Sequence, residues 1–70
     1  MPYSKEQVAE NLRVCRARKN VRQADVADAT GISAVSVCAW ESGKQVMTLD
    51  NAVKIADYYG ISLDELAGRV

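Results

Sequence analysis

The chain has 70 residues, of which 49% are hydrophobic and 26% charged, and its formal net charge at pH 7 is zero. A chain this short can build only one small core, so we expect a single domain over residues 1–70. The absence of a run of about 18 apolar residues and of a leader pattern excludes a membrane span and favours a soluble cytoplasmic protein.

The first predicted helix begins close to the N-terminus. Ser4 followed by Gln7 is a capping-box pattern, in which the serine hydroxyl accepts from the third helical N–H and the glutamine reaches back to the cap. The helix should end near Asn20, because asparagine tolerates the left-handed conformation common just past a helix. Three apolar residues share one helical face and are expected in the core: Val8, Leu12 and Cys15.

A second, shorter helix is predicted over residues 23–30. It turns Val26 and Ala27 inward and closes at Gly31. Glycine suits a tight corner because it has no Cβ to clash at positive φ. A tight turn at Gly31 predicts that another helix follows directly.

Ser33 is a good N-cap for a third helix over residues 33–42. Val37 and Trp40 lie three apart and should point to the core. Two short helices joined by a turn of about three residues are the signature of a helix-turn-helix, which we place at about residues 22–43.

Two more helices complete the chain. The fourth begins at Thr48 and ends before Gly60, and Ser62 with Glu65 forms a capping box that opens a short fifth helix. Their apolar residues are Leu49, Ala52, Val53, Ile55, Ala56 and Tyr59 in the fourth helix, and Leu63 and Leu66 in the fifth. Alternation typical of a strand is nowhere sustained, so the sequence predicts an all-α fold of five helices of 6 to 16 residues.

The charges are unevenly placed along this neutral chain. Residues 11–24 carry five basic side chains and no acidic one, whereas the part from residue 45 onward is acidic. The basic residues are Arg13, Arg16, Arg18, Lys19 and Arg22. A basic segment favours a phosphate backbone as partner, and three or four neutralised phosphates would give a slope of log affinity against log salt of roughly −3 to −4 per subunit.

The sequence contains few of the residue patterns that catalysis or metal binding requires. The chain has no histidine, no Gly-rich phosphate loop and no closely spaced cysteine pair, so we expect no metal, no cofactor and no enzyme activity. A disulfide between Cys15 and Cys38 is formally possible, but reduced thiols are expected in a cytosolic protein. Cys15 is expected in the core.

Several motifs together resemble the Cro/C1-type helix-turn-helix regulators, the lambda-repressor-like fold of small phage repressors and of many bacterial regulators and antitoxins. The motifs are Arg16, the stretches RQADVADATGIS and WESGK, and the stretch ADYYGISLDEL, and the match spans about residues 8–67. The resemblance implies a compact five-helix bundle that binds double-stranded DNA.

The resemblance also implies roles for residues around the third helix. Gln23 and Lys44 match positions that contact the DNA backbone, with a solvated polar residue as the alternative for each. Arg16 and Glu41 match a structural ion pair, with unpaired surface charges as the alternative. Four basic residues are expected to add backbone affinity: Arg13, Arg18, Lys19 and Arg22. Arg22 departs from the Ser or Thr that the family places at this N-cap, and Met47 departs from its frequent proline.

By family position, the base-facing residues are Ser33, Ala34, Val35, Ser36, Cys38 and Ala39. This set lacks the Arg, Lys, Asn and Gln side chains that usually read bases. Methyl contacts to thymine, serine hydroxyls and DNA shape remain as means of readout. An apolar patch for a protein partner is the alternative. Cys38 is expected to be a small space-filling residue, with a redox switch as its alternative.

The resemblance further implies a two-fold dimer contact near the C-terminus. The candidate residues are Tyr58, Tyr59, Ile61, Leu63 and Leu66, with a purely structural core role as the alternative. The leading hypothesis is therefore a transcriptional repressor that binds a palindromic operator as a homodimer, with recognition helices about 34 Å apart. The alternative is a protein-interaction module on the same fold, such as an antitoxin or adaptor.

Overall fold

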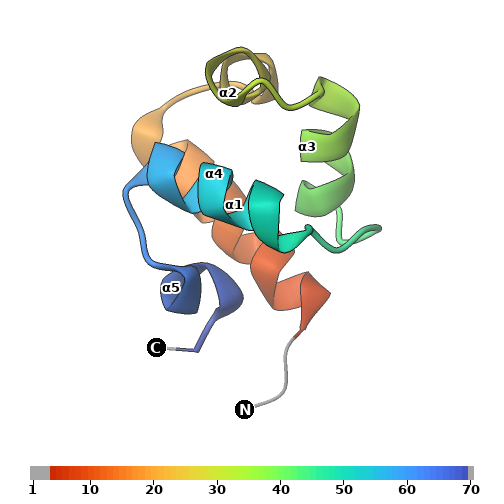
Figure 1. Ribbon diagram of the computed structural model, residues 1–70, viewed down its shortest axis with the longest axis vertical. Coiled ribbons are helices and arrows are strands. Elements are labelled where there is room, and N and C mark those ends of the chain that lie inside the picture. The colour runs from red at the N-terminus through yellow and green to blue at the C-terminus, as the bar shows by residue number, and fades with distance from the viewer. Residues whose placement is uncertain (1–3, 70) are drawn as a thin grey trace.

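The computed structural model describes residues 4–69, and within this range the chain forms helices and no strand (Figure 1). The helices are α1 (Lys5–Lys19), α2 (Gln23–Thr30), α3 (Ala34–Glu41), α4 (Leu49–Tyr59) and α5 (Leu63–Ala67). The all-α prediction with five helices is confirmed for the described residues. The predicted domain also includes residues 1–3 and 70, which lie outside them. The helices have 5 to 15 residues, slightly shorter than predicted, because the cap residues lie outside them.

Side-chain hydroxyls begin α1, α3, α4 and α5. In each case the hydroxyl oxygen accepts a hydrogen bond from the backbone N–H three residues later, at 3.0 to 3.3 Å. The capping residues are Ser4, Ser33, Thr48 and Ser62. Such caps satisfy N–H groups that have no partner within the helix, and each stabilises its helix by about 1 kcal/mol.

One of the two predicted capping boxes is present and the other is not. The Glu65 carboxylate accepts from the Ser62 backbone N–H at 3.2 Å, which completes the box of α5. Gln7 instead donates from Nε2 to Oδ1 of Asn11 at 3.0 Å. Asn11 is held in place because its own amide donates to the backbone carbonyls of Glu65 and Leu66 in α5. A long-range contact between α1 and α5 has therefore replaced the local bond expected for Gln7.

The connection between α2 and α3 turns on Gly31, whose φ of 74° lies in the left-handed region. Its N–H still donates to the carbonyl of Ala27, and Ser33 caps the next helix two residues later. Asn20 takes the same left-handed conformation, with a φ of 58°, at the end of α1. Both helix ends fall where the sequence predicts them.

The core lies where α1, α3, α4 and α5 meet beneath α2, and Val26 of α2 is completely buried in it. Figure 1 shows α2 across one end of the molecule and α5 near the opposite end of the molecule. Between them, α3 lies along one side of α1. The other residues of the core are Val8, Leu12, Ile32, Val37, Trp40, Ile55, Ala56 and Leu66. Ala27 is only half-buried. In residues 4–69 no helix has the length and apolar character needed to cross a bilayer.

Candidate nucleic-acid interface

The outer side of α3 is small and largely apolar. Val37 and Trp40 on the inner side are 3% and 5% exposed, so they fix the helix against the core. Val35 points the opposite way and is 79% exposed. The other residues expected to face bases are exposed or half-buried: Ser33, Ala34, Ser36, Cys38 and Ala39. The rotation of α3 therefore presents this set to solvent.

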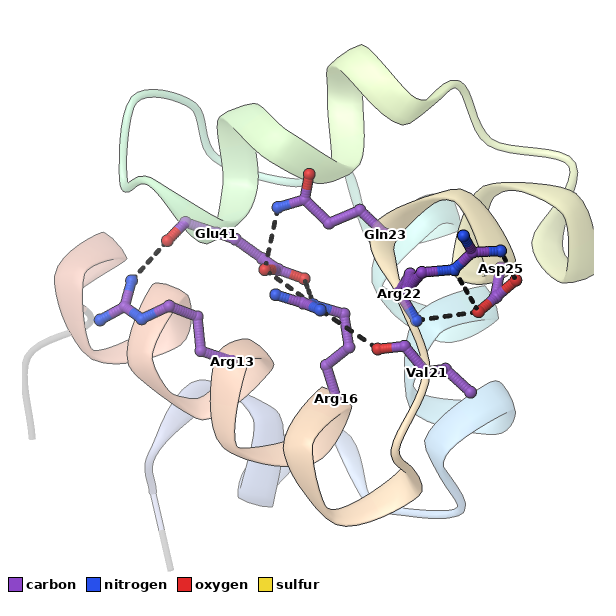
Figure 2. Close-up of polar contacts among 7 residues, drawn as sticks. All are labelled: Arg13, Arg16, Val21, Arg22, Gln23, Asp25 and Glu41. Atoms are coloured by element: carbon purple, nitrogen blue, oxygen red, sulfur yellow. Dashed lines mark hydrogen bonds and ion pairs between the residues drawn. The ribbon is translucent and has the colours of Figure 1, made fainter.

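A buried carboxylate ties α3 to α1 and α2 (Figure 2). Glu41, the last residue of α3, is 4% exposed, and Nε of Arg16 donates to its two oxygens at 2.9 and 3.0 Å. Gln23, the first residue of α2, donates from Nε2 to Oε1 of the same carboxylate at 3.1 Å. The hydrogen bond to Glu41 is the main reason that the pKa of Arg16 is raised. Charge and hydrogen bonding are thus satisfied together, as a buried carboxylate requires.

Two further bonds fix the ends of the elements around this carboxylate. The guanidinium of Arg13 donates to the backbone carbonyl of Glu41, which has no partner within α3. Nη1 of Arg16 donates to the carbonyl of Val21 at 3.1 Å, in the short link between α1 and α2. Arg13 and Arg16 therefore act first as connectors between helices, and their positive charges lie beside the C-terminal end of α3.

Arg22 begins α2 without a capping hydroxyl, and Asp25 compensates. The Asp25 carboxylate accepts from the Arg22 backbone N–H at 2.9 Å and contacts its guanidinium at 3.4 and 3.5 Å (Figure 2). The backbone hydrogen bond from Arg22, followed by the side-chain bond, lowers the pKa of Asp25 below its ordinary value. The Arg22 side chain is 83% exposed, so its guanidinium remains open to a second anion.

Lys44 lies beside the outer face of α3. Its backbone N–H donates to the carbonyl of Ala39 at 3.0 Å, which folds the loop after Gly43 back along the helix. Lys44 and Ser42 line one side of a shallow hollow whose other walls are residues of α3. Those residues are Ala34, Val35, Cys38 and Ala39. A lysine thus flanks the apolar face.

Two short helices joined by a tight turn are also what the comparison with protein families identifies. A family model described as "Helix-turn-helix" matches residues 12–66. The chain belongs to the helix-turn-helix family. This confirms the resemblance to Cro/C1-type regulators. Membership in a helix-turn-helix family with transcriptional regulators among its relatives also agrees with the prediction that the chain is not an enzyme.

Relatives of this helix-turn-helix chain are named as transcriptional regulators. It is 47% identical over 62 residues to the cryptic phage CTXphi transcriptional repressor RstR of Vibrio cholerae, over 89% of this chain and 55% of the relative. It therefore spans little more than half the length of that repressor. It is 34% identical over 55 residues to an HTH-type regulator, MJ0272, of Methanocaldococcus jannaschii, over 79% of this chain and 83% of the relative.

A solved structure has the same fold. The crystal structure of the DNA-binding domain of BldD superimposes with a TM-score of 0.79 and 26% sequence identity. The superposition covers 96% of this chain and 99% of that domain. The lambda-repressor-like, all-α fold is therefore confirmed along nearly the whole chain.

Two basic residues of this helix-turn-helix domain lie away from α3. On α1, Arg18 lies about 140° and about 160° around the helix axis from Arg13 and Arg16. It lies on the side of Asn11, which meets α5. Arg18 and Lys19 border a hollow with Tyr59 and Ile61, and Nζ of Lys19 lies 4.9 Å from the ring centre of Tyr58. The basic stretch of the sequence is thus divided between two faces, which sequence position alone did not indicate.

The candidate dimer residues of the helix-turn-helix domain differ in their exposure. Leu66 is 3% exposed and belongs to the core, which agrees with the structural alternative for this residue, and a dimer contact through it stays a prediction. Tyr58, Tyr59 and Ile61 are half-buried against the core. Burial, with a contribution from the Glu41 charge, raises the pKa of Tyr59. Leu63 is 41% exposed and remains free at the surface.

An apolar groove beside Leu63 was not predicted from the sequence. Leu49 and Val46, 70% and 55% exposed, form it together with Leu63 and residues below them. The deeper residues are Val8, Met47, Ala52, Leu66 and Ala67. Leu49 and Leu63 each occupy the first position of a helix, so helical periodicity gives no signal that they share a surface.

Both cysteines of the domain are free. Cys15 is buried, and burial raises the pKa of its thiol, whereas Cys38 is exposed on α3. Residues 4–69 contain no cluster of three or more His, Cys, Asp or Glu side chains that could hold a metal ion.

Proposed function

We propose that this protein binds double-stranded DNA in a sequence-dependent way, with α3 in the major groove, and represses transcription from a palindromic operator as a homodimer. The observation that carries the proposal is the fixed orientation of α3. Glu41, Arg16 and Arg13 tie its end to α1, so the face of Val35 is exposed and rigidly directed. A rigid helix with one free face is what major-groove recognition requires.

Groups that favour phosphate belong to the same helix-turn-helix. Arg22 is largely exposed at the start of α2, where the backbone N–H groups and the helix dipole favour an anion. Lys44 borders the hollow on α3, in the loop that follows this helix. Gln23 stands at the same helix start. Its amide nitrogen donates to Glu41, and within residues 4–69 its amide oxygen has no protein partner. We assign the backbone contacts to Arg22, Lys44 and the N-terminus of α2.

Dimer formation is proposed through the surface around Leu63. Its exposed neighbours Leu49 and Val46 extend the apolar area across the start of α4. The other candidates, Tyr58 and Tyr59 at the end of α4 and Ile61 in the link to α5, are half-buried against the core. Binding to a palindromic operator requires a two-fold axis that sets the two α3 helices about one DNA turn, ~34 Å, apart. The proposed function places the protein in the cytoplasm, where the DNA of a bacterial or archaeal cell lies.

Selection from a random duplex pool at about 50 mM salt tests this function. The proposal predicts that sequencing of the retained duplexes yields a symmetric motif with two half-sites one helical turn apart. The matched control is Val14→Asp, which adds the same charge on the exposed part of α1, whereas Val35→Asp adds it to the centre of the proposed interface. Retention of the motif by the Val35→Asp protein, or no retention by the wild type, would contradict the proposal.

A second candidate function rests on the same apolar face. A large exposed valine surrounded by alanines and a cysteine is also suited to a protein partner, as in an antitoxin or adaptor. The two functions differ in their response to charge. Val35→Asp should abolish binding in both cases, but Arg22→Gln and Lys44→Gln should weaken only DNA binding, because an apolar protein contact needs no phosphate partner.

A further inference from the structure

The hydroxyl groups on and beside α3 are engaged within the protein. Ser33 Oγ accepts from the Ser36 backbone N–H at 3.2 Å and donates to Ser36 Oγ at 3.0 Å. Ser42 Oγ donates to the carbonyl of Ala39 at 3.0 Å. Among residues 4–69 the Ser36 hydroxyl proton has no partner, and Ser36 is half-buried. Polar reading of base edges by this helix is therefore weak.

Apolar surface is what α3 offers in place of polar groups. The side chain of Val35 is 79% exposed at the edge of the hollow formed with Ala34, Cys38 and Ala39. Lys44 supplies the charge at its border, and no acidic residue lines it. This combination suits an apolar group carried by a negatively charged polymer.

The major groove presents one apolar group of this size, the methyl group at C5 of thymine. A cytosine methylated at C5 places the same methyl group at the same edge of its base pair. The two bases differ at position 4, where thymine has an acceptor oxygen and cytosine a donor amino group. A helix with few polar groups has little means of detecting that difference.

We propose that α3 reads the C5-methyl group of pyrimidines, so that 5-methylcytosine substitutes for thymine and methylation of cytosine in an operator strengthens binding. This inference rests on the proposed function, because it requires α3 to lie in the major groove. It makes Val35 a specificity-determining residue, and it makes the affinity of an operator depend on a covalent modification of the DNA.

The test uses the duplex that the wild-type protein selects from the random pool. Each thymine in a half-site is replaced in turn by deoxyuridine, which removes only the methyl group, and dissociation constants are measured by fluorescence anisotropy at fixed salt. Each contacted methyl group should contribute about fourfold in affinity, from the value of burying one methylene-sized group. At the same position, 5-methylcytosine paired with guanine should bind about fourfold more tightly than cytosine paired with guanine.

Two valine variants assign the effect to α3. Val35→Ala removes the partner of the methyl group, so thymine and deoxyuridine duplexes should bind this variant equally, with the affinity of wild type for the deoxyuridine duplex. Val14→Ala, at a valine 42% exposed on α1, should keep the full ratio. Equal wild-type affinity for thymine and deoxyuridine at every position, with the motif still bound, would overturn methyl reading and leave the proposed function standing. Failure to select any duplex would overturn both.

Discussion

The side chain of Glu41 in α3 forms hydrogen bonds that join this helix to α1 and α2. Its carboxylate is buried and receives three hydrogen bonds, two from Arg16 and one from Gln23, while its backbone carbonyl receives a fourth from Arg13. A buried pair of this kind contributes little net stability compared with an apolar pair, but it is costly to break. Its contribution is to fix the direction of α3.

Arg16→Met should therefore destabilise the protein more than an ordinary surface change. The substitution leaves the Glu41 carboxylate 4% exposed and without its cation, at a cost of about 3 kcal/mol in the free energy of unfolding. Urea denaturation followed by tryptophan fluorescence measures this, because Trp40 lies one residue from Glu41 in the core. The Arg16→Met, Glu41→Leu double variant should recover most of the loss, since it removes the unpaired charge.

Arg18→Met is the matched control for this experiment. Arg18 lies on the same helix, is exposed, and has no salt bridge among the described residues. The control should change stability by less than about 0.5 kcal/mol. Equal losses in Arg16→Met and Arg18→Met would show that the Glu41 network does not hold α3.

At the scale of elements, the helices could be predicted because their signals are local. Ser33, Thr48 and Ser62 bond to N–H groups three residues away, and Gly31 closes α2 by its own backbone conformation. The capping box predicted for Gln7 is absent for the opposite reason. Its partner Asn11 is positioned by α5, more than 50 residues along the chain.

The interface could be predicted only in part, for the same physical reason. The outward face of α3 follows from its periodicity and from the inward pair Val37 and Trp40. The separation of Arg18 from Arg13 depends on which neighbours surround α1, and the groove at Leu63 depends on how α4 and α5 pack. Such facts arise from tertiary packing, which a single sequence does not display.

The division of charges predicts a smaller salt effect than the basic stretch suggests. Arg13 and Arg16 are engaged at Glu41, and Arg18 and Lys19 lie towards the end of α4. This leaves Arg22 at the start of α2 and Lys44 beside α3 for the proposed phosphate contacts. Two phosphates per subunit give a slope of log affinity against log salt of about −2. Anisotropy titrations from 50 to 200 mM salt measure it.

Single substitutions check the assignment of these two charges. Lys44→Gln and Arg22→Gln should each make the slope shallower by about one per subunit, whereas Lys19→Gln should leave it unchanged. A steeper slope of about −4 that falls on Lys19→Gln would place the phosphates along α1 instead.

At the scale of the whole molecule, the proposed dimer is tested at the surface around Leu63. Leu63 is the first residue of α5, where a glutamate is compatible with the helix dipole, so Leu63→Glu should preserve the fold. The added charge should nevertheless prevent an apolar contact between copies. On a duplex with two half-sites, the variant should bind one copy at a time and lose cooperativity.

Analytical ultracentrifugation of protein–DNA mixtures counts the copies on that duplex. Wild type should bind as two copies, and Leu63→Glu should bind as one with about the affinity of wild type for a single half-site. Val14→Glu, which places the same charge on an exposed part of α1, is the control and should behave as wild type. Cooperative binding of two Leu63→Glu copies would remove the groove from the dimer interface.

The proposed DNA-binding surface is tested most directly by NMR. Backbone amide shifts of the labelled protein are followed during titration with its selected duplex. We predict that the largest changes fall on the outer face of α3 around Val35, at the start of α2 and at Lys44, because these regions carry the proposed base and backbone contacts. Changes centred on Arg18, Lys19 and the α4–α5 connection, with α3 unaffected, would contradict it.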